Sequence, residues 1–225
     1  MNRPAQSMRI LPYRKPTEGR DYWLFDDALP DPDAVRARTL QRTDWIDGYP
    51  FKQESWPGRR VIPGLLPDEL DIIEDKVRAA TGAKKLWVGD TGDDNARLNH
   101  NCIQVVGAGE CEPRPHTDSR RLCRYAAVLY LNPGVPAHCG TSFYRQRLPM
   151  GRLGGNIAPP PNANLVEALG TRFVPPDSFV EDVSIPYRYN SLLLYQSNMI
   201  HSATAYCGDT LEAKRMAAVY FWMAK

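Results

Sequence analysis

The sequence has few cysteines, and they lack the spacings that would give them a structural role. Five occur among 225 residues, the count is odd, and none forms a Cys-x-x-Cys pair. This pattern is typical of reduced thiols in a cytoplasm and argues against a disulfide framework or a zinc ribbon. The first nine residues, Met-Asn-Arg-Pro-Ala-Gln-Ser-Met-Arg, contain no apolar run that would direct secretion. We therefore expect a cytoplasmic protein.

Long apolar segments and a strong net charge are also missing. The longest apolar stretch, residues 216–224, is far shorter than the roughly 20 residues that span a bilayer, so no membrane association is expected. The formal net charge is only +2, which does not call for a nucleic-acid partner. There is no Gly-x-Ser-x-Gly nucleophile elbow, phosphate loop or dinucleotide fingerprint. These absences argue against an α/β-hydrolase and against the common nucleotide-binding enzymes.

Two helices are predicted in the first half of the chain. Asp31-Pro32-Asp33 supplies a capping carboxylate and a proline in the first turn, and the helix should run to about Arg42. A second start lies at Pro67-Asp68-Glu69, and Gly82 supplies its stop. We expect residues 1–98 to form an N-terminal segment whose helices pack on the outside of a sheet.

From residue 99 onward the pattern is that of strands. Short apolar runs separated by turns lie at 102–106, 125–131, 141–145, 183–187, 191–195 and 216–223. No long helices alternate with them, which favours an antiparallel barrel or sandwich over a doubly wound α/β sheet. We predict a mainly β catalytic core at 99–225, joined with 1–98 in a single domain. The Gly- and Pro-rich residues 148–177 interrupt the strands and are predicted to form a lid or rim over the active site.

Three residues suggest a metal centre. Residues i and i+2 of a strand share a face, so His116 and Asp118 point the same way. His201 follows a later apolar strand and a short polar turn. Two imidazoles and one carboxylate can hold divalent iron on one side and leave positions open for chemistry.

A nearby arginine suggests a bound anion. Arg215 opens the last apolar strand, and a guanidinium inside a barrel is costly unless it meets a negative charge. Lys214 is adjacent and has the opposite orientation, so only one of the two points inward. We predict that Arg215 is the one.

Taken in order along the chain, these residues resemble the Fe(II)/2-oxoglutarate-dependent dioxygenase superfamily, and within it the small bacterial members similar to prolyl hydroxylases. This resemblance covers roughly residue 99 to the C-terminus. The sequence also resembles an uncharacterised bacterial family whose members carry a comparable Thr-x-Phe-Tyr-Arg segment. The resemblance rests on His116-x-Asp118, Tyr130-Leu131-Asn132, Cys139-Gly140-Thr141 before Phe143, His201 and Arg215.

The resemblance implies a double-stranded β-helix, a jelly-roll barrel of the cupin type. It implies that His116, Asp118 and His201 bind Fe(II), and that Arg215 and Tyr130 bind the far carboxylate of 2-oxoglutarate. Oxygen would be the other co-substrate, and an unactivated C–H bond would be hydroxylated with release of succinate and CO2. The presence of Asp118 favours hydroxylation or desaturation over chlorination. Two departures are Ala217, where many members carry a hydroxyl, and Cys139, where a glycine is commoner.

The substrate is less constrained. A small molecule, an amino acid or a peptide is expected, and Arg145, Arg147 and Gln104 are the predicted substrate contacts. Seven arginines between positions 114 and 152 are compatible with an acidic ligand or with a solvated surface. Open alternatives are a non-oxygenase cupin, such as an isomerase or a small-molecule-binding protein, and a nucleic-acid demethylase. A homodimer is left open as well.

Overall fold

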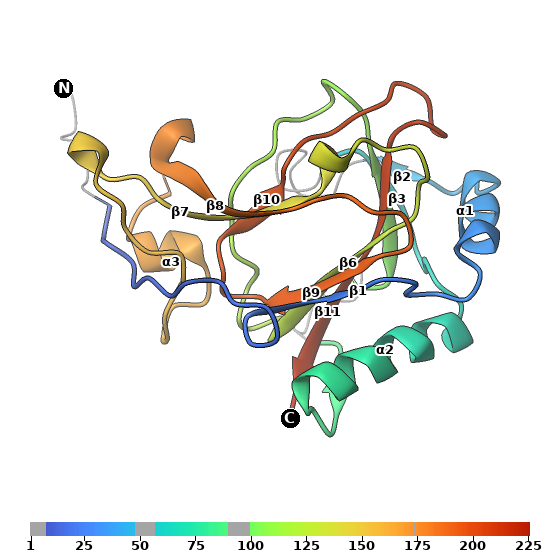
Figure 1. The fold of residues 1–225 in the computed structure, drawn as a ribbon, viewed down its shortest axis with the longest axis horizontal. Coiled ribbons are helices and arrows are strands. Elements are labelled where there is room, and N and C mark those ends of the chain that lie inside the picture. Colours follow the sequence, from blue (N-terminus) through green and yellow to red (C-terminus); the bar gives the residue numbers. More distant parts are fainter. Residues whose placement is uncertain (1–7, 48–56, 90–99, 173) are drawn as a thin grey trace.

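Two antiparallel sheets form the body of the computed structural model, which describes residues 8–47, 57–89, 100–172 and 174–225 (Figure 1). The larger sheet runs in the order β1-β9-β6-β11-β5-β3-β2, with β4 also pairing with β11. The smaller sheet has the order β10-β7-β8. The larger sheet comprises β1 (Tyr22–Phe25), β2 (Ile46–Asp47), β3 (Arg59–Val61), β4 (Leu86–Trp87), β5 (Cys102–Val106), β6 (Tyr125–Tyr130), β9 (Leu192–Gln196) and β11 (Arg215–Ala224). The smaller one comprises β7 (Thr141–Gln146), β8 (Phe179–Ile185) and β10 (His201–Ala203).

Side chains of the larger sheet alternate between two cores, as the period of two requires. In β6, Tyr125, Ala127 and Leu129 belong to the core beneath the helices. The intervening Ala126, Val128 and Tyr130 belong to a second core, which they share with Phe143 of β7 and Ile185 of β8. This second core lies between the two sheets, so the sheets face each other as in a jelly roll.

The two predicted helices cover the outer face of the larger sheet. Helix α1 (Pro32–Leu40) begins after Asp31, whose side chain accepts a hydrogen bond from the amide of Ala34. Helix α2 (Pro67–Thr81) ends at Gly82, which has a left-handed φ of 72°. Ile73 and Val77 of α2 are fully buried in the outer core. Strands β1 and β3 of the N-terminal segment pair directly with β9 and β5, so this segment is part of the sheet as well as its cover.

The segment 148–177 is mostly irregular. It contains α3 (Leu165–Leu169) and the 3-10 turn η4 (Pro149–Gly151), and it ends within the 3-10 turn η5 (Pro176–Ser178). Another 3-10 turn, η3 (Ala137–Cys139), precedes β7. Helix α3 is capped by Asn164 and packs Leu165 and Leu169 against Leu11 near the N-terminus. Within the described ranges, every helix is too short or too polar to cross a membrane.

An N-terminal strap, residues 9–14, runs beside this segment (Figure 1). The buried side chain of Gln146 accepts a hydrogen bond from the amide of Leu11 and donates one to the carbonyl of Arg9. Asn156, also buried, bonds both the amide and the carbonyl of Arg14. Two side-chain amides thus replace the strand pairing that an extended chain would otherwise need.

Candidate functional site

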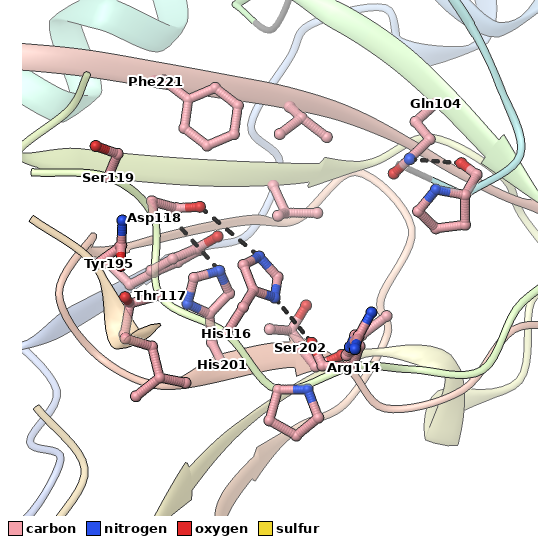
Figure 2. Close-up of a pocket in the computed structure, with 18 of the residues that line it drawn as sticks. Gln104, Arg114, His116, Thr117, Asp118, Ser119, Tyr195, His201, Ser202 and Phe221 are labelled. Carbon is pink, nitrogen blue, oxygen red and sulfur yellow. Dashed lines mark hydrogen bonds and ion pairs between the residues drawn. The ribbon is translucent and has the colours of Figure 1, made fainter. Parts of the chain in front are cut away.

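His116, Asp118 and His201 converge at one end of the space between the sheets (Figure 2). The Asp118 Oδ1 atom lies 3.8 Å from His116 Nε2, and Oδ2 lies 3.6 Å from His201 Nε2. One ligand atom from each residue falls within 4.8 Å of the others. Both carboxylate-to-imidazole distances exceed those of ordinary hydrogen bonds, so the imidazoles do not satisfy the carboxylate.

The two imidazoles are oriented by backbone carbonyls. His116 Nδ1 lies 2.9 Å from the oxygen of Arg114, and His201 Nδ1 lies 2.9 Å from the oxygen of Met199. A carbonyl oxygen only accepts hydrogen bonds, so each Nδ1 carries the proton. The lone pair is then on Nε2, the atom that faces Asp118. This is the arrangement that metal-binding histidines usually show.

The electrostatics of the site favour a bound cation. Burial raises the pKa of Asp118 to about 6 and lowers the pKa of His201 to about 4. Desolvation and the neighbouring His201 also lower the pKa of His116, but 55% of that side chain is exposed, so solvent weakens both effects. Within the described part of the chain, the buried Oδ2 atom of Asp118 has no hydrogen-bond donor. Two neutral imidazoles and an unsatisfied carboxylate form a donor set that fits a divalent transition metal.

The three side chains open into a cavity of about 680 Å³. The larger sheet contributes an apolar wall of Val128, Val219 and Phe221. The segment 148–177 contributes further lining residues from α3 and from either side of it: Asn164, Leu165, Val166, Arg172 and Val174. A cavity of this size, apolar with a few convergent polar groups, is typical of a small-molecule site.

Arg215 lines the same cavity and is only 5% exposed. Its Nε donates to the carbonyl of Cys139 at 2.8 Å, and its Nη2 to that of Gly140 at 3.4 Å. Among the residues that the structure describes, no carboxylate lies within 4 Å of this guanidinium. Lys214 instead pairs with Glu110 and does not line the cavity. The alternation of β11 thus orients Arg215 inward, as predicted.

Tyr130 and Thr141 lie beside Arg215. The Tyr130 hydroxyl is fully buried, does not line the cavity, and donates a hydrogen bond of 2.8 Å to Thr141 Oγ1. Thr141 does line the cavity, and its own proton is left for another acceptor. The Tyr130 ring lies 5.4 Å from the Arg215 guanidinium, and the hydroxyl that faces the cavity beside them is that of Thr141. The sequence signal for it was the Gly140-Thr141 turn, which lies opposite Tyr130 only in the folded chain.

The predicted substrate contacts separate into two groups. Gln104 lines the cavity and donates to the carbonyl of Pro57 at 2.7 Å. Arg145 and Arg147 are not among the cavity-lining residues; the Arg145 guanidinium lies 3.8 Å over the ring of Tyr13. The register of β7 against β8 shifts between Phe143 and Tyr144, where Asp182 of β8 has no partner on β7, and Arg145 lies just beyond this shift. For these two arginines, substrate contact is a prediction without support in the geometry.

Tyr195 is a cavity residue that sequence reasoning missed. It is buried in β9, and its ring centroid lies 4.5 Å from that of His201 (Figure 2). Burial and the charge of Asp118 raise the pKa of its hydroxyl well above the ordinary value, so the hydroxyl keeps its proton. In the sequence it is one residue of an apolar strand, and nothing marks it as different from a core aromatic.

Comparison with known families identifies the chain at the level of the family. Residues 6–154 match the model of DUF6445, a family of unknown function. The chain belongs to the DUF6445 family. The matched region contains His116, Asp118, Tyr130 and Thr141, whereas His201 lies beyond it. No curated protein matches the sequence of this DUF6445 member.

Solved structures share its architecture. The epimerase SnoN, in complex with Fe3+, alpha ketoglutarate and nogalamycin RO, aligns with a TM-score of 0.50 and 15% identity over 91% of this chain and 79% of its own. The alpha ketoglutarate dependent carbocyclase SnoK aligns with a TM-score of 0.50 and 15% identity over 90% and 79%. A Pseudomonas putida prolyl-4-hydroxylase aligns at 0.49 and 15% identity over 91% and 93%. The DUF6445 protein therefore has the fold of non-heme iron, 2-oxoglutarate-dependent enzymes, and the predicted fold is confirmed.

Proposed function

We propose that the protein is an Fe(II)- and 2-oxoglutarate-dependent oxygenase that hydroxylates an unactivated C–H bond of a small molecule, an amino acid or a peptide. Succinate and CO2 would be the co-products. One observation carries the proposal. A three-residue donor set and a buried guanidinium without a carboxylate partner in the described chain open into one cavity. The donor set suits iron with open coordination positions, and the guanidinium suits a dicarboxylate beside the iron.

In this function His116, Asp118 and His201 hold the iron from one side. The carbonyls of Arg114 and Met199 keep both Nε2 atoms unprotonated and fixed in direction. The Asp118 carboxylate gains the positive partner that it lacks among the described residues. When bound, the iron with 2-oxoglutarate and O2 supplies the oxidising chemistry that cleaves the C–H bond.

Arg215 holds the far carboxylate of 2-oxoglutarate by charge and by its N–H groups. The Thr141 hydroxyl donates a further hydrogen bond to this carboxylate, while Tyr130 holds the Thr141 side chain in position. Val128, Val219 and Phe221 keep water from the space between the iron and the substrate. The open side, lined by residues of the segment 148–177, admits the substrate.

The proteins with the same fold include an epimerase and a carbocyclase as well as a prolyl hydroxylase. The fold is therefore compatible with several outcomes of C–H oxidation. Hydroxylation is the outcome that we propose, because Asp118 completes a ligand set that resembles that of the hydroxylases. Product analysis by mass spectrometry, with a gain of one oxygen atom expected, separates hydroxylation from the other outcomes.

The test is an anaerobic titration of the protein with Fe(II) and 2-oxoglutarate, followed by a measurement of succinate after admission of air. The wild-type protein should show a weak visible charge-transfer band. Arg215→Gln should weaken 2-oxoglutarate binding about a hundredfold, equivalent to about 3 kcal/mol. Lys214→Gln is the matched control and should bind as the wild type does. Absence of the band and of succinate, or equal affinity in Arg215→Gln, would refute the function.

A further inference from the structure

Two guanidinium groups border the cavity without an acidic partner among the residues that the structure describes. Arg114 precedes His116 in the loop between β5 and β6, and Arg172 follows α3; both side chains are exposed and line the cavity. Neither forms an ion pair or a side-chain hydrogen bond within the described ranges. Glu112 also lines the cavity but pairs with neither. Apart from the metal ligands and Arg215, the charged lining residues thus have an excess of positive charge.

The position of Arg114 is fixed relative to the candidate metal centre. Its carbonyl oxygen accepts the hydrogen bond from His116 Nδ1, so its backbone is held beside a metal ligand (Figure 2). Arg114 and His116 line the same cavity, so a negatively charged group bound by Arg114 would lie in the cavity that holds the candidate metal centre.

A second, independent feature points to a missing acceptor. The hydroxyl of Thr117, which is 7% exposed and lines the cavity, has no hydrogen-bond partner among the described residues. A buried hydroxyl without a partner is costly, so this part of the cavity lining lacks an acceptor for it.

The rest of the outer lining is largely apolar. Leu165, Val166 and Val174 come from the segment that includes α3, and Leu122 from the turn before β6. This surface fits an aliphatic or aromatic body better than a sugar or a nucleotide. The cavity thus combines an apolar wall with cationic groups at its mouth.

We propose that the substrate is a small carboxylic acid with an apolar body, whose carboxylate is bound at the cavity mouth by Arg114 and Arg172. The planar guanidinium fork suits a carboxylate, and the apolar body packs against the α3 side of the cavity. This inference rests on the proposed function, because it takes Arg215 to be occupied by 2-oxoglutarate.

The experiment compares N-acetyl-leucine, N-acetyl-phenylalanine and N-acetyl-valine with their carboxamides. Each is titrated anaerobically into the protein carrying Fe(II) and 2-oxoglutarate, and binding is followed by the perturbation of the visible band. At least one carboxylate should bind ten times more tightly than its amide, and added salt should reduce the difference. Phosphate monoesters of the N-acetyl amino alcohols with the same side chains are titrated in the same way, to compare a phosphate with the carboxylate.

Variants assign the binding groups. The preference for the carboxylate over the amide should fall at least tenfold in Arg114→Gln, in Arg172→Gln or in both. Both variants should keep the Fe(II)/2-oxoglutarate band. Arg121→Gln is the control, since Arg121 lies 3.8 Å from Glu167 and does not line the cavity. The proposal is overturned if carboxylates bind no better than amides, if neither binds, if the phosphate esters bind more tightly, or if both variants keep the preference. Failure of the proposed function is distinct, because then no band forms before any acid is added.

Discussion

His116 and His201 exchange two backbone hydrogen bonds, with N–O distances of 3.0 and 2.8 Å. The bridge joins residues far apart in the chain and sets their ring centroids 4.5 Å apart. His201 also pairs with Phe143 of β7, so the smaller sheet holds the bridge in place. The direction of both rings is thus fixed by strand pairing, and the metal site is organised by the fold itself.

Replacement of Asp118 by Asn should separate stability from metal binding. Burial raises the pKa of Asp118 to about 6. Neutral pH lies above the pKa of this carboxyl in both the folded and the unfolded protein, so the group is ionised in both. Keeping the ionised carboxylate buried then costs the folded, metal-free protein about 3 kcal/mol of stability. The metal-free Asp118→Asn variant should therefore be more stable than the wild type by about 1–3 kcal/mol in urea unfolding. Mn(II) should stabilise the wild type, by an amount that grows with the logarithm of its concentration above the dissociation constant, and should leave the variant unchanged.

The exposed Asp71 on α2 provides the control for this change. Asp71→Asn should leave both the stability and the response to Mn(II) at wild-type values. A metal-free Asp118→Asn protein that is less stable than the wild type, and that still responds to Mn(II), would contradict the assignment of Asp118 as a ligand.

Thr141 and Tyr130 should differ in their effect on co-substrate binding. Thr141→Val removes a hydroxyl that lines the cavity and should weaken 2-oxoglutarate binding about tenfold, or about 1.4 kcal/mol. Tyr130→Phe should weaken it less, because the phenol does not line the cavity and acts on the ligand through Thr141 and Arg215. Titration of the visible band measures both. Ser184→Ala, at an exposed position, is the neutral control. A larger loss of 2-oxoglutarate affinity in Tyr130→Phe than in Thr141→Val would mean that Tyr130 contacts the ligand directly.

Much of the framework could be predicted from local sequence signals. The Asp31 cap and the Gly82 stop mark the ends of α1 and α2 to within two residues, because capping depends on adjacent residues. The strands of the core are apolar runs whose alternation correctly separates Arg215 from Lys214. The apolar periodicity of helices and strands allows these elements to be predicted, because one face of each element must be buried.

The remainder depends on contacts between distant segments. Strands β1 and β10 have only 4 and 3 residues and exist because β9 and β7 pair with them. The register shift just before Arg145 in the pairing of β7 with β8 has no signature in its own sequence. β8 begins at Phe179 instead of 183, because its first residues pair with Gln146 and Arg145 of β7. Thr141 and Tyr195 acquire their roles only when the sheets face each other.

Asn156 should anchor the N-terminal strap. Its side chain is buried and makes hydrogen bonds of 3.0 and 2.8 Å to the amide and carbonyl of Arg14. Asn156→Ala would leave both backbone groups unpaired and should cost about 2 kcal/mol in unfolding free energy. Trypsin should then cleave after Arg14 more rapidly, because the strap opens more often. Asn162→Ala, which removes only a local bond to the Pro159 carbonyl, should change neither rate nor stability.

His100 should make the protein sensitive to mild acid. Its ring is 9% exposed, lies 5.3 Å from that of Trp222, and has Nδ1 2.9 Å from the Phe221 carbonyl. Burial lowers its pKa to about 4, so between pH 6.5 and 4 the unfolded chain binds a proton that the folded protein does not. The stability from this neutral ring is complete above about pH 6.5 and falls by about 3 kcal/mol as pH drops through 4.

Urea unfolding of the metal-free protein at several pH values tests this effect. Between pH 7 and 4 the unfolding free energy of His100→Gln should fall less than that of the wild type. The two losses should differ by about 3 kcal/mol over this range. His138, which is exposed in the turn before β7, is the control, and His138→Gln should follow the wild-type curve. The comparison between variants removes the contribution of the metal ligands, which all three proteins share. Parallel curves for His100→Gln and the wild type would mean that the ring is already charged, or solvated, in the folded protein.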